Sequence, residues 1–342
     1  MSVTRFFHPV LPSRALRAAP KRVVVDDEPF VLFRDARGRA CALVDRCPHR
    51  FAPLSRGSVN ARGELRCAYH GWTFDGEGRG RSASQPSLAK CDARAMRCEE
   101  RHGYVWIASR DVPASVAPPA WDFERDHRFC GAFAMRFDAP LHAVLDNFSE
   151  DEHTPFVHTR LGWREDDVLA IRFHAESFDD RTEVHYDAPQ RPTRVGRIFG
   201  LRPGDVFHND WVTRFDPVCT IYRTKWLDPK TNAPRPLRIT SPIFFVPESR
   251  STTMLHTFVF AQIGAPHARF FPILRHVATA VAWGEIRDDA RFIHVVRDTP
   301  RSMRGMRLGK FDKPLVHNRK LLDAIYFRRA SEGGEEFFPS GS

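Results

Sequence analysis

The sequence predicts an α+β protein in which a small all-β domain precedes a larger domain that mixes longer strands with helices. Its 342 residues are enough for two domains of about 150 residues each, and 42% hydrophobic residues with 28 Phe allow a sizeable core. Three observations predict the division: short β-type runs in the first third, a proline-rich stretch after them, and helical periodicity only later. We place the domains at residues 1–112 and 113–342.

The elements follow in that order along the chain. Strands are expected at 23–25, 30–34, 42–44, 72–74 and 104–107, with turns at 35–38 and 75–78. Residues 111–120 contain Pro113, Pro118 and Pro119, so they form the linker. In the second domain, 243–246 and 252–262 are expected as strands, and 143–157 and 277–296 as helices.

Charge and cysteine content exclude several classes of protein. The net charge of +10 comes almost entirely from residues 1–110, which hold 20 Lys and Arg against 11 Asp and Glu. No basic run has interleaved aromatic residues, so nucleic acid is not expected as a partner. The longest stretch without charge, 251–268, is interrupted by polar residues, glycine and proline, so no membrane span is expected. Seven cysteines, an odd number, without a recognisable signal peptide favour reduced thiols, metal ligation and a cytoplasmic location.

Two Cys–His pairs form the first candidate metal site. Cys47-Pro-His49 is followed, after seventeen residues, by Cys67-Ala-Tyr-His70. These four donors could hold one zinc ion tetrahedrally. One Cys and one His on each loop is also what a two-iron cluster requires when two thiolates bind one iron and two imidazoles bind the other. The other five cysteines are assigned no chemistry.

This pattern resembles the [2Fe–2S] motif of Rieske proteins, specifically that of the Rieske non-haem iron ring-hydroxylating oxygenases. The resemblance rests on Cys47-Pro-His49-Arg50, Gly57 and Cys67-Ala-Tyr-His70-Gly71-Trp72. It implies a Rieske cluster held by Cys47, His49, Cys67 and His70. Because the oxidised cluster with two thiolates is neutral, the positive charge of the domain remains. We therefore expect an acidic electron donor, a ferredoxin or a flavin reductase, although a basic surface that serves only solubility is the alternative.

Two histidines in an acid-rich segment form the second candidate metal site. His153 and His158 are five residues apart and would point about 140° from each other on an ideal α-helix. Both can bind one ion only if the helix is distorted. Pro155 lies between them and would cause a kink or a wide π-type turn.

A non-haem Fe(II) centre needs two histidines and one carboxylate on one face. The expected helix at 277–296 supplies a carboxylate. Its inward face is predicted to contain Val277, Ala280, Ala282, Ile286, Ala290 and Ile293. Asp289 lies about 60° from Ile286, whereas Asp288 lies about 200° away. We therefore predict Asp289 as the third ligand and Asp288 as a solvated side chain.

His153, His158 and Asp289 also match the ligand pattern of the same oxygenase family. That pattern has an acid three residues before the first histidine, usually Asp, which bridges to a cluster histidine of the neighbouring subunit. Here the acid is Glu150, and Asp151 is a competing candidate. The resemblance implies a helix-grip (START-like) catalytic domain, with an antiparallel sheet curled around long helices. It also implies a homotrimer packed head to tail.

The resemblance implies a terminal oxygenase component with a [2Fe–2S] cluster, mononuclear Fe(II) and O₂ as co-substrate. It leans toward hydroxylation or O-/N-dealkylation rather than ring cis-dihydroxylation. The alternatives are a Rieske electron carrier without oxygenase activity and a zinc-stabilised interaction protein. Several aromatic side chains could line an apolar cavity for an aromatic or polycyclic substrate, although such side chains are more often ordinary core, and they are Phe207, Trp211, Phe215, Tyr222, Phe244, Phe245, Phe258 and Phe260. Arg214, Arg223 and Lys225 could pair with a substrate carboxylate or be solvated, so the substrate class stays open.

Overall fold

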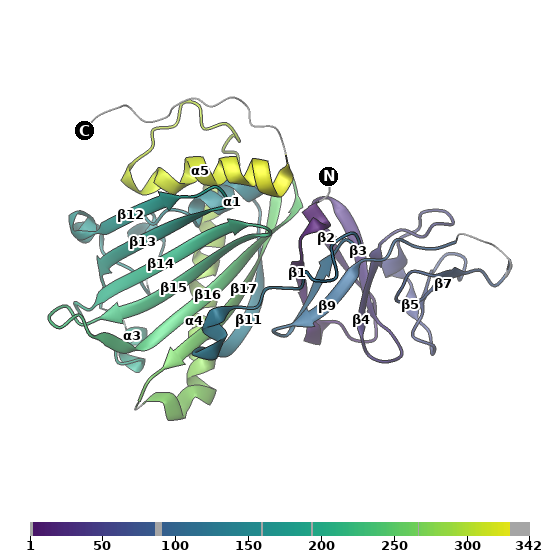
Figure 1. Cartoon of the computed structure of the whole chain (residues 1–342), viewed down its shortest axis with the longest axis horizontal. Coiled ribbons are helices and arrows are strands. Elements are labelled where there is room, and N and C mark those ends of the chain that lie inside the picture. Colours follow the sequence, from purple (N-terminus) through teal and green to yellow (C-terminus); the bar gives the residue numbers. More distant parts are fainter. Residues whose placement is uncertain (1–2, 86–90, 159, 193, 266, 329–342) are drawn as a thin grey trace.

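A computed structural model describes residues 3–85, 91–158, 160–192, 194–265 and 267–328 of the chain. Two lobes are evident in Figure 1: a small lobe of short strands built from the first third of the chain, and a larger lobe built around one broad sheet. The architecture is α+β, as predicted.

The small lobe consists of three antiparallel sheets, ordered β1-β10-β9, β2-β3-β4 and β5-β6-β7-β8. The five expected strands are all present, with bounds that differ by one or two residues, and five further strands were not expected, so the described residues of this lobe form ten strands. They are β1 (His8–Pro12), β2 (Lys21–Val25), β3 (Glu28–Arg34), β4 (Ala40–Val44), β5 (Ser58–Val59), β6 (Leu65–Arg66), β7 (Thr73–Phe74), β8 (Gly80–Arg81), β9 (Arg97–Arg101) and β10 (Tyr104–Ala108).

Both predicted turns are present and are built in the same way. Asp35 Oδ1 accepts the backbone N–H groups of Arg37 and Arg39, each at 2.9 Å. In the second turn, Asp75 Oδ1 accepts the backbone N–H groups of Glu77 and Arg79 at the same distances. In both turns the aspartate side chain takes the place of a backbone carbonyl as hydrogen-bond acceptor. This stabilises the tight turn between neighbouring strands.

The chain crosses between the lobes after β10. Residues 111–120 form neither helix nor strand, as predicted for a linker, and the short turn η4 (Asp122–Arg125) leads into the second lobe. The boundary at residues 112 and 113 itself stays a prediction. One apolar cluster contains side chains of both lobes, including Phe30 and Val105 from the first with Phe137 and Phe245 from the second. The two lobes therefore share part of their core.

The large lobe contains a seven-stranded antiparallel sheet ordered β11-β17-β16-β15-β14-β13-β12. Its strands are β11 (Arg128–Phe137), β12 (Arg172–Ser177), β13 (Arg181–Pro189), β14 (Val206–Phe215), β15 (Val218–Leu227), β16 (Pro234–Ser249) and β17 (Thr252–Ile263). The long helix α4 (Phe271–Phe292) packs on β11 and β17. Smaller helical segments are α1 (Leu141–Asn147), α2 (Thr154–Val157), α3 (Arg194–Ile198), η5 (Glu165–Ala170), α5 (Lys313–Leu321) and the π-helical turn η9 (Leu322–Phe327). A sheet that curves around helices is the predicted helix-grip architecture.

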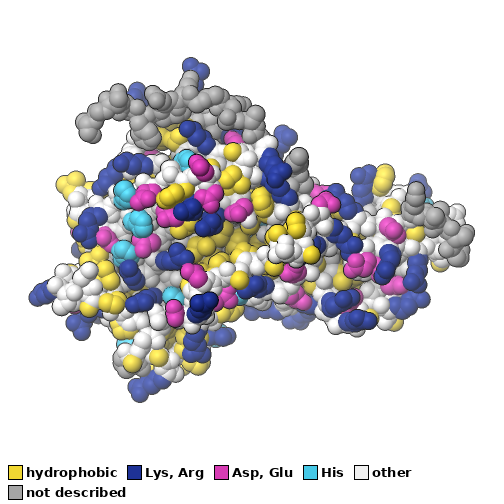
Figure 2. Space-filling view, viewed as in Figure 1, with side chains coloured by type: hydrophobic (Ala, Val, Ile, Leu, Met, Phe, Trp, Pro, Cys, Tyr) yellow, Lys and Arg dark blue, Asp and Glu magenta, His cyan; other side chains and the backbone are white. Residues whose placement is uncertain are grey.

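Alternation along β14 separates the two faces of this sheet. Phe207, Asn209 and Trp211 are buried and face the interior, whereas His208 and Asp210 lie on the opposite face. Figure 2 shows His, Asp and Glu side chains gathered over β12 to β14 on that opposite face. The interior face of the sheet is therefore available to form a cavity.

The helix expected at 143–157 is wrong as a single helix. α1 ends at Asn147, and α2 begins only at Thr154. Proline is favoured in the first turn of a helix, where its missing N–H is not needed, so Pro155 starts a new helix instead of bending an existing one. The helix expected at 277–296 is present as α4, which ends at Phe292 and is followed by the turn η7 (Ile293–Val295). One predicted inward residue of α4, Ala280, is exposed. Within the described ranges, no helix has the length and apolar character needed to cross a bilayer.

Candidate metal centres and substrate cavity

The two Cys–His loops of the small lobe have the same backbone shape. Cys47 N–H donates to the carbonyl of Ala52 at 2.9 Å, and Phe51 N–H donates back to the carbonyl of Cys47 at 2.8 Å. Cys67 makes the equivalent pair of bonds with Trp72 and Gly71, at 2.7 and 3.1 Å. The residue four after each cysteine has a positive φ, 62° at Phe51 and 71° at Gly71. The two loops therefore have the same backbone conformation, and each places one cysteine and one histidine next to those of the other loop.

The four side chains are sorted by type into two pairs. The thiols of Cys47 and Cys67 are both buried, with 2% of each residue exposed. The rings of His49 and His70 are exposed, with centroids 4.5 Å apart, and Trp72 stacks on His49. Burial raises the pKa of the Cys47 thiol to about 11, so thiolates here require a cation. An inner thiol pair and an outer imidazole pair fit a cluster in which each pair binds its own iron.

A single zinc ion fits the same donors less well. Four ligands around one zinc at 2.0–2.3 Å would bring their donor atoms within about 4 Å of one another. Across the described residues, the sets of three or more donors close enough for one ion include none of these four side chains.

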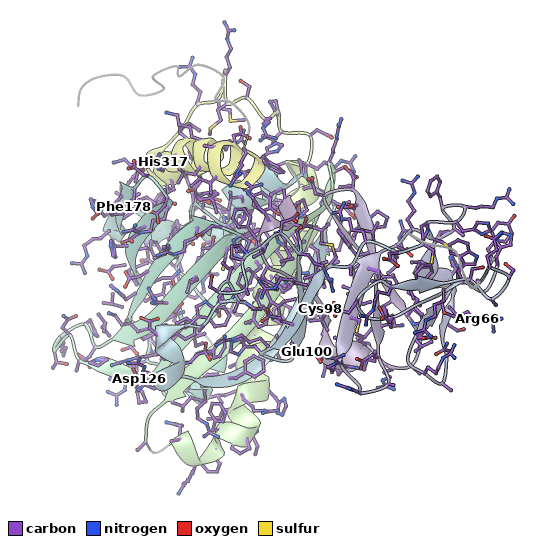
Figure 3. All side chains as sticks on the ribbon, turned by 45° about the vertical axis from the view of Figure 1, so that its right-hand side comes forward. Arg66, Cys98, Glu100, Asp126, Phe178 and His317 are labelled. Atoms are coloured by element: carbon purple, nitrogen blue, oxygen red, sulfur yellow. The ribbon has the colours of Figure 1, made fainter. Side chains whose placement is uncertain are left out.

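Figure 3 shows Arg66, the neighbour of Cys67, at the end of the small lobe that is farthest from the large sheet.

His153 and His158 meet because α2 is only one turn long. His153 precedes it with helical backbone angles (φ −70°, ψ −18°), whereas His158 follows it with extended ones (φ −95°, ψ 143°). The second ring thus leaves the helical path and turns back toward the first. Their Nε2 atoms lie 3.2 Å apart. The helical distortion expected near Pro155 is therefore present, because the helix ends before His158.

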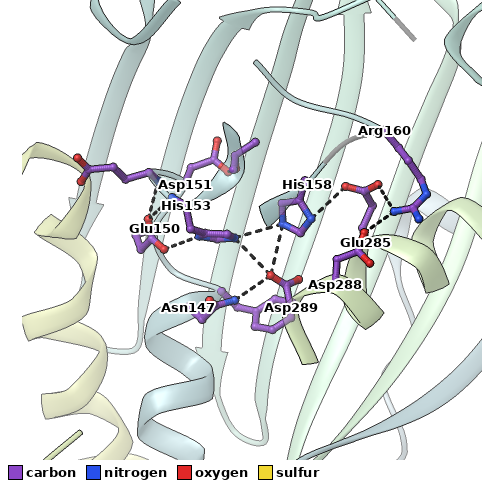
Figure 4. A network of polar contacts seen from close by, with 12 residues as sticks. Asn147, Glu150, Asp151, His153, His158, Arg160, Glu285, Asp288 and Asp289 are labelled. Carbon is purple, nitrogen blue, oxygen red and sulfur yellow. Dashed lines mark hydrogen bonds and ion pairs between the residues drawn. The ribbon is translucent and has the colours of Figure 1, made fainter. Parts of the chain in front are cut away.

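Asp289 completes a triangle of donor atoms with the two imidazoles (Figure 4). Its Oδ1 lies 3.4 Å from His153 Nε2 and 3.3 Å from His158 Nε2. Two ligands bound at about 2.1 Å and at right angles would be about 3 Å apart, so the triangle has the size of one face of an octahedral ion. Asp289 is only 4% exposed, although the helical pattern predicts it at the margin of the inward face. Two histidines and one carboxylate on one face fit mononuclear iron.

Carboxylates around the triangle favour a positive charge at its centre. Burial would raise the pKa of Asp289, but the charge on His158 and hydrogen bonds from both rings outweigh burial and hold the pKa far below its usual value. Burial lowers the pKa of His153, yet the Glu150 and Asp289 carboxylates reverse this effect and raise it well above normal. A divalent cation bound to neutral imidazoles would supply the same charge.

Each of the three donor side chains also has a second contact. His153 Nδ1 donates to Glu150 Oε1, and Asn147 Nδ2 donates to Asp289 Oδ1 at 3.1 Å. Glu285 Oε2 lies 3.2 Å from His158 Nδ1, as an ion-pair contact without hydrogen-bond alignment. Sequence reasoning missed Asn147 and Glu285. Glu285 lies one helical turn before Asp289, and this i, i+4 spacing is the signal that could have found it.

The geometry favours Glu150 over Asp151 as the acid that accompanies His153. Glu150 uses Oε1 for the histidine and Oε2 for the backbone N–H of Glu152 at 2.5 Å. Asp151 turns away and accepts the hydroxyl of Thr154 at 2.6 Å.

The prediction that Asp288 is solvated is wrong. Its side chain is only 16% exposed and accepts Arg160 Nη1 at 2.5 Å, and the same guanidinium lies 3.4 Å from Glu285. The residues after His158 pack against α4 on this side, which places the guanidinium of Arg160 beside Asp288 and Glu285. Asp288 is still not part of the donor triangle.

An apolar cavity of about 190 Å³ opens on the triangle. Of the predicted aromatic residues, Phe207, Trp211 and Tyr222 line it, and the other five do not. None of the three cations considered for substrate binding lines it either. They are Arg214, Arg223 and Lys225, and they do not point inward on β14 and β15.

Comparison with known proteins assigns both lobes. Residues 6–95 match the model of the Rieske [2Fe-2S] domain. Residues 137–325, more than half of the chain, match that of the vanillate O-demethylase oxygenase C-terminal domain. These matches lie on either side of the proposed domain boundary.

Similar proteins extend this picture. The chain is 35% identical over 156 residues to chlorophyllide a oxygenase of Chlamydomonas reinhardtii, covering 43% of this chain and 23% of that protein. It is 34% identical over 167 residues to the vanillate O-demethylase oxygenase subunit of a Pseudomonas species, covering 45% and 48%. The chain thus spans less than half the length of both curated relatives.

Solved structures share the fold over nearly the whole chain. Dicamba monooxygenase bound to dicamba has a TM-score of 0.74 at 20% identity and covers 96% of this chain and 100% of its own. An NdmA mutant of Pseudomonas putida CBB5 with caffeine has a TM-score of 0.68 at 20% identity and covers 95% and 91%.

Proposed function

Because this chain belongs to the Rieske non-haem iron oxygenases, we propose that it is a terminal oxygenase component that acts on a small aromatic molecule. It takes electrons from an acidic ferredoxin or flavin reductase and uses O₂ to hydroxylate the substrate or to remove an O- or N-linked alkyl group. The observation that carries the proposal is a buried triangle of two histidines and one carboxylate that faces an apolar, aromatic-lined cavity. An electron carrier would not need this second site.

The family implies a [2Fe–2S] cluster and a mononuclear iron, and the residues fit both. Cys47, Cys67, His49 and His70 would hold the cluster. His153, His158 and Asp289 would hold the iron, which supplies the activation of O₂ when it is bound.

The protein contributes orientation and a dry site. Glu150 fixes the ring of His153 through Nδ1, and Asn147 fixes the carboxylate of Asp289. The aromatic wall of β14 and β15 excludes water and holds the substrate against the triangle. In an O-demethylation, one O₂, two electrons and two protons convert the methyl ether into a hydroxyl group, formaldehyde and water.

A head-to-tail homotrimer would deliver the electrons. Figure 1 shows the short strands that carry the Cys–His loops at one end of the molecule and the helices of the large lobe toward the other. His49 and His70 are exposed at that end, together with the large side chains of Phe51 and Tyr69. We propose that this tip packs near Glu150 of a second copy, while the basic face of the small lobe receives the acidic electron donor. The seven cysteines form no disulfide, in keeping with the cytoplasm as the proposed location.

A single-turnover experiment tests the function. The iron-loaded protein is reduced with dithionite, freed of excess reductant and mixed with O₂ and a panel of aromatic methyl ethers and N-methyl heterocycles. We expect formaldehyde or a hydroxylated product in an amount that does not exceed the reducing equivalents stored in the protein. The His153→Ala variant should retain the cluster absorption but form no product. Equal product from that variant would refute the proposed catalytic site.

A further inference from the structure

We propose that the substrate is a neutral molecule with a single aromatic ring, and that Asn209 holds a hydrogen-bond acceptor on it. This inference rests on the proposed oxygenase function and specifies its substrate class. Three properties of the cavity carry it: the charges of its lining, one amide nitrogen without a partner, and its volume.

The lining has no positive side chain to bind an anion. Four carboxylates line the cavity, those of Glu150, Asp151, Glu285 and Asp289, and no Lys or Arg of the described ranges does. Burying a substrate carboxylate here would therefore cost much of its hydration energy without a compensating ion pair. Each of the four carboxylates already has a partner within the protein, so none is left to pair with a substrate cation.

Two arginines beside His158 and Glu285 are already engaged by protein groups. Arg160 pairs with Glu285 and Asp288. Arg191 donates to the backbone carbonyls of His158, at 2.7 Å, and Trp163. Neither guanidinium is available for a ligand anion, so charge favours a neutral molecule over an aromatic acid.

Asn209 provides a polar contact on the sheet side of the cavity. It lies between Phe207 and Trp211 on the interior face of β14, and only 8% of it is exposed. Its Oδ1 accepts the hydroxyl of Thr224, the residue opposite on β15, at 2.8 Å. Its Nδ2 donates to no residue among those described. Because Nδ2 is not fully enclosed by protein atoms, it is free to donate to a carbonyl or ether oxygen of a ligand in the cavity.

The cavity volume limits the ligand to one ring. An apolar cavity of about 150 Å³ in an engineered protein holds one benzene molecule. A volume of about 190 Å³ therefore fits a single ring with small substituents. A fused two-ring molecule would need the walls to move.

Anaerobic titration calorimetry of the iron-loaded chain with matched probes tests all three properties. The reference probe is 4-methoxybenzamide, which is neutral and carries a carbonyl acceptor. We expect it to bind about tenfold tighter than 4-methoxytoluene, which lacks the acceptor. We expect 4-methoxybenzoate to bind at least about a hundredfold more weakly than the amide. The cation 4-methoxybenzylamine and the two-ring 6-methoxy-2-naphthamide should also bind more weakly.

A conservative variant isolates Asn209. Asn209→Asp keeps an acceptor for Thr224 and loses both N–H donors, so it should reduce the tenfold preference for the amide over 4-methoxytoluene to less than about threefold. Asp210→Asn, the next residue on the opposite face of β14, is the matched control and should keep the full preference.

The proposal is overturned if the benzoate or the benzylamine binds as tightly as the amide, if the naphthamide binds tighter, or if Asn209→Asp keeps the preference. The wild-type comparisons stand even if the variant does not fold. Binding is measured without O₂, so it tests recognition alone. Formaldehyde released from bound 4-methoxybenzamide when the reduced protein meets O₂ tests the oxygenase function separately.

Discussion

Glu285 contacts His158 from the same helix that presents Asp289. One turn of α4 separates the two acids, so Asp289 completes the donor triangle while Glu285 lies at the far nitrogen of one of its imidazoles. Carboxylates in this position set the tautomer and the orientation of a metal-binding histidine. Arg160 in turn neutralises Glu285, and without this partner a carboxylate so deeply buried would be costly. The geometry of the site thus depends on residues that never touch the ion.

Replacing Glu285 with Gln should weaken metal binding. We expect the dissociation constant for Fe²⁺, or for Co²⁺ as a spectroscopic substitute, to rise about tenfold or more, because His158 loses the charge that orients it. Asp288→Asn is the matched control, since Asp288 shares Arg160 but makes no contact with His158. Spectroscopic titration of both variants decides the matter. An equal loss in the two would mean that Arg160, and not the contact with His158, is what the site requires.

At the scale of elements, α5 is attached to α1 by a buried ion pair. Arg319 binds the carboxylate of Asp146 with two nitrogens and also donates to the carbonyls of Pro300 and Arg301. Burial raises the pKa of Asp146 to about 6 even beside this guanidinium. Asp146 precedes Asn147, which holds Asp289, so this attachment also positions the donor triangle.

The variant Arg319→Met should therefore be strongly destabilised. Removing one member of a buried pair leaves a buried charge without a partner, which costs about 3 kcal/mol. Arg172→Met removes an ion pair with Asp187 in which the arginine is 79% exposed, and it should change stability by less than about 1 kcal/mol. Urea unfolding of the two variants measures the difference. If both variants lose the same stability, the attachment of α5 is not as we describe it.

The strands that were predicted, five in the small lobe and parts of β16 and β17 in the large one, have a local signal. In β14, the alternation that separates Phe207 and Trp211 from His208 and Asp210 can be read from the residues themselves. The end of α1 was missed because Pro155 can either bend one helix or begin a second, and only the fold shows that it begins a second.

The candidate site follows the same division. The donors of both centres were predicted from short motifs and from position on one helix face. The solvated assignment of Asp288 failed because its partner, Arg160, is 128 residues away along the chain. No periodicity within α4 contains that information. The same is true of Asn147, whose contact with Asp289 exists only in the folded structure.

At the scale of the whole molecule, the two candidate centres lie in different lobes. The Cys–His loop that follows Arg66 lies at the outer end of the small lobe (Figure 3), whereas the donor triangle lies between α4 and the α1–α2 region of the large one (Figure 4). Transfer between copies of the chain is therefore the arrangement that we propose.

Mixing two inactive variants tests that arrangement. Cys47→Ser would lose the cluster, and His153→Ala would lose the mononuclear iron, so each alone should be inactive. If copies associate at random and electrons pass from one copy to the next, co-expression should restore about a quarter of wild-type turnover, because one junction in four joins an intact cluster to an intact iron site. Turnover of the co-expressed protein by formaldehyde release gives the answer. No recovery in a mixed assembly would show that transfer occurs within one chain.

The central claim is that one chain carries a Rieske cluster and a separate mononuclear iron. The most direct measurement is an EPR spectrum of the dithionite-reduced protein, with iron and zinc quantified on the same sample. We predict a Rieske-type signal with about three irons per chain. In His153→Ala the same signal should remain, with about two irons. One zinc per chain with neither colour nor signal would contradict the account and would leave a zinc-stabilised interaction protein.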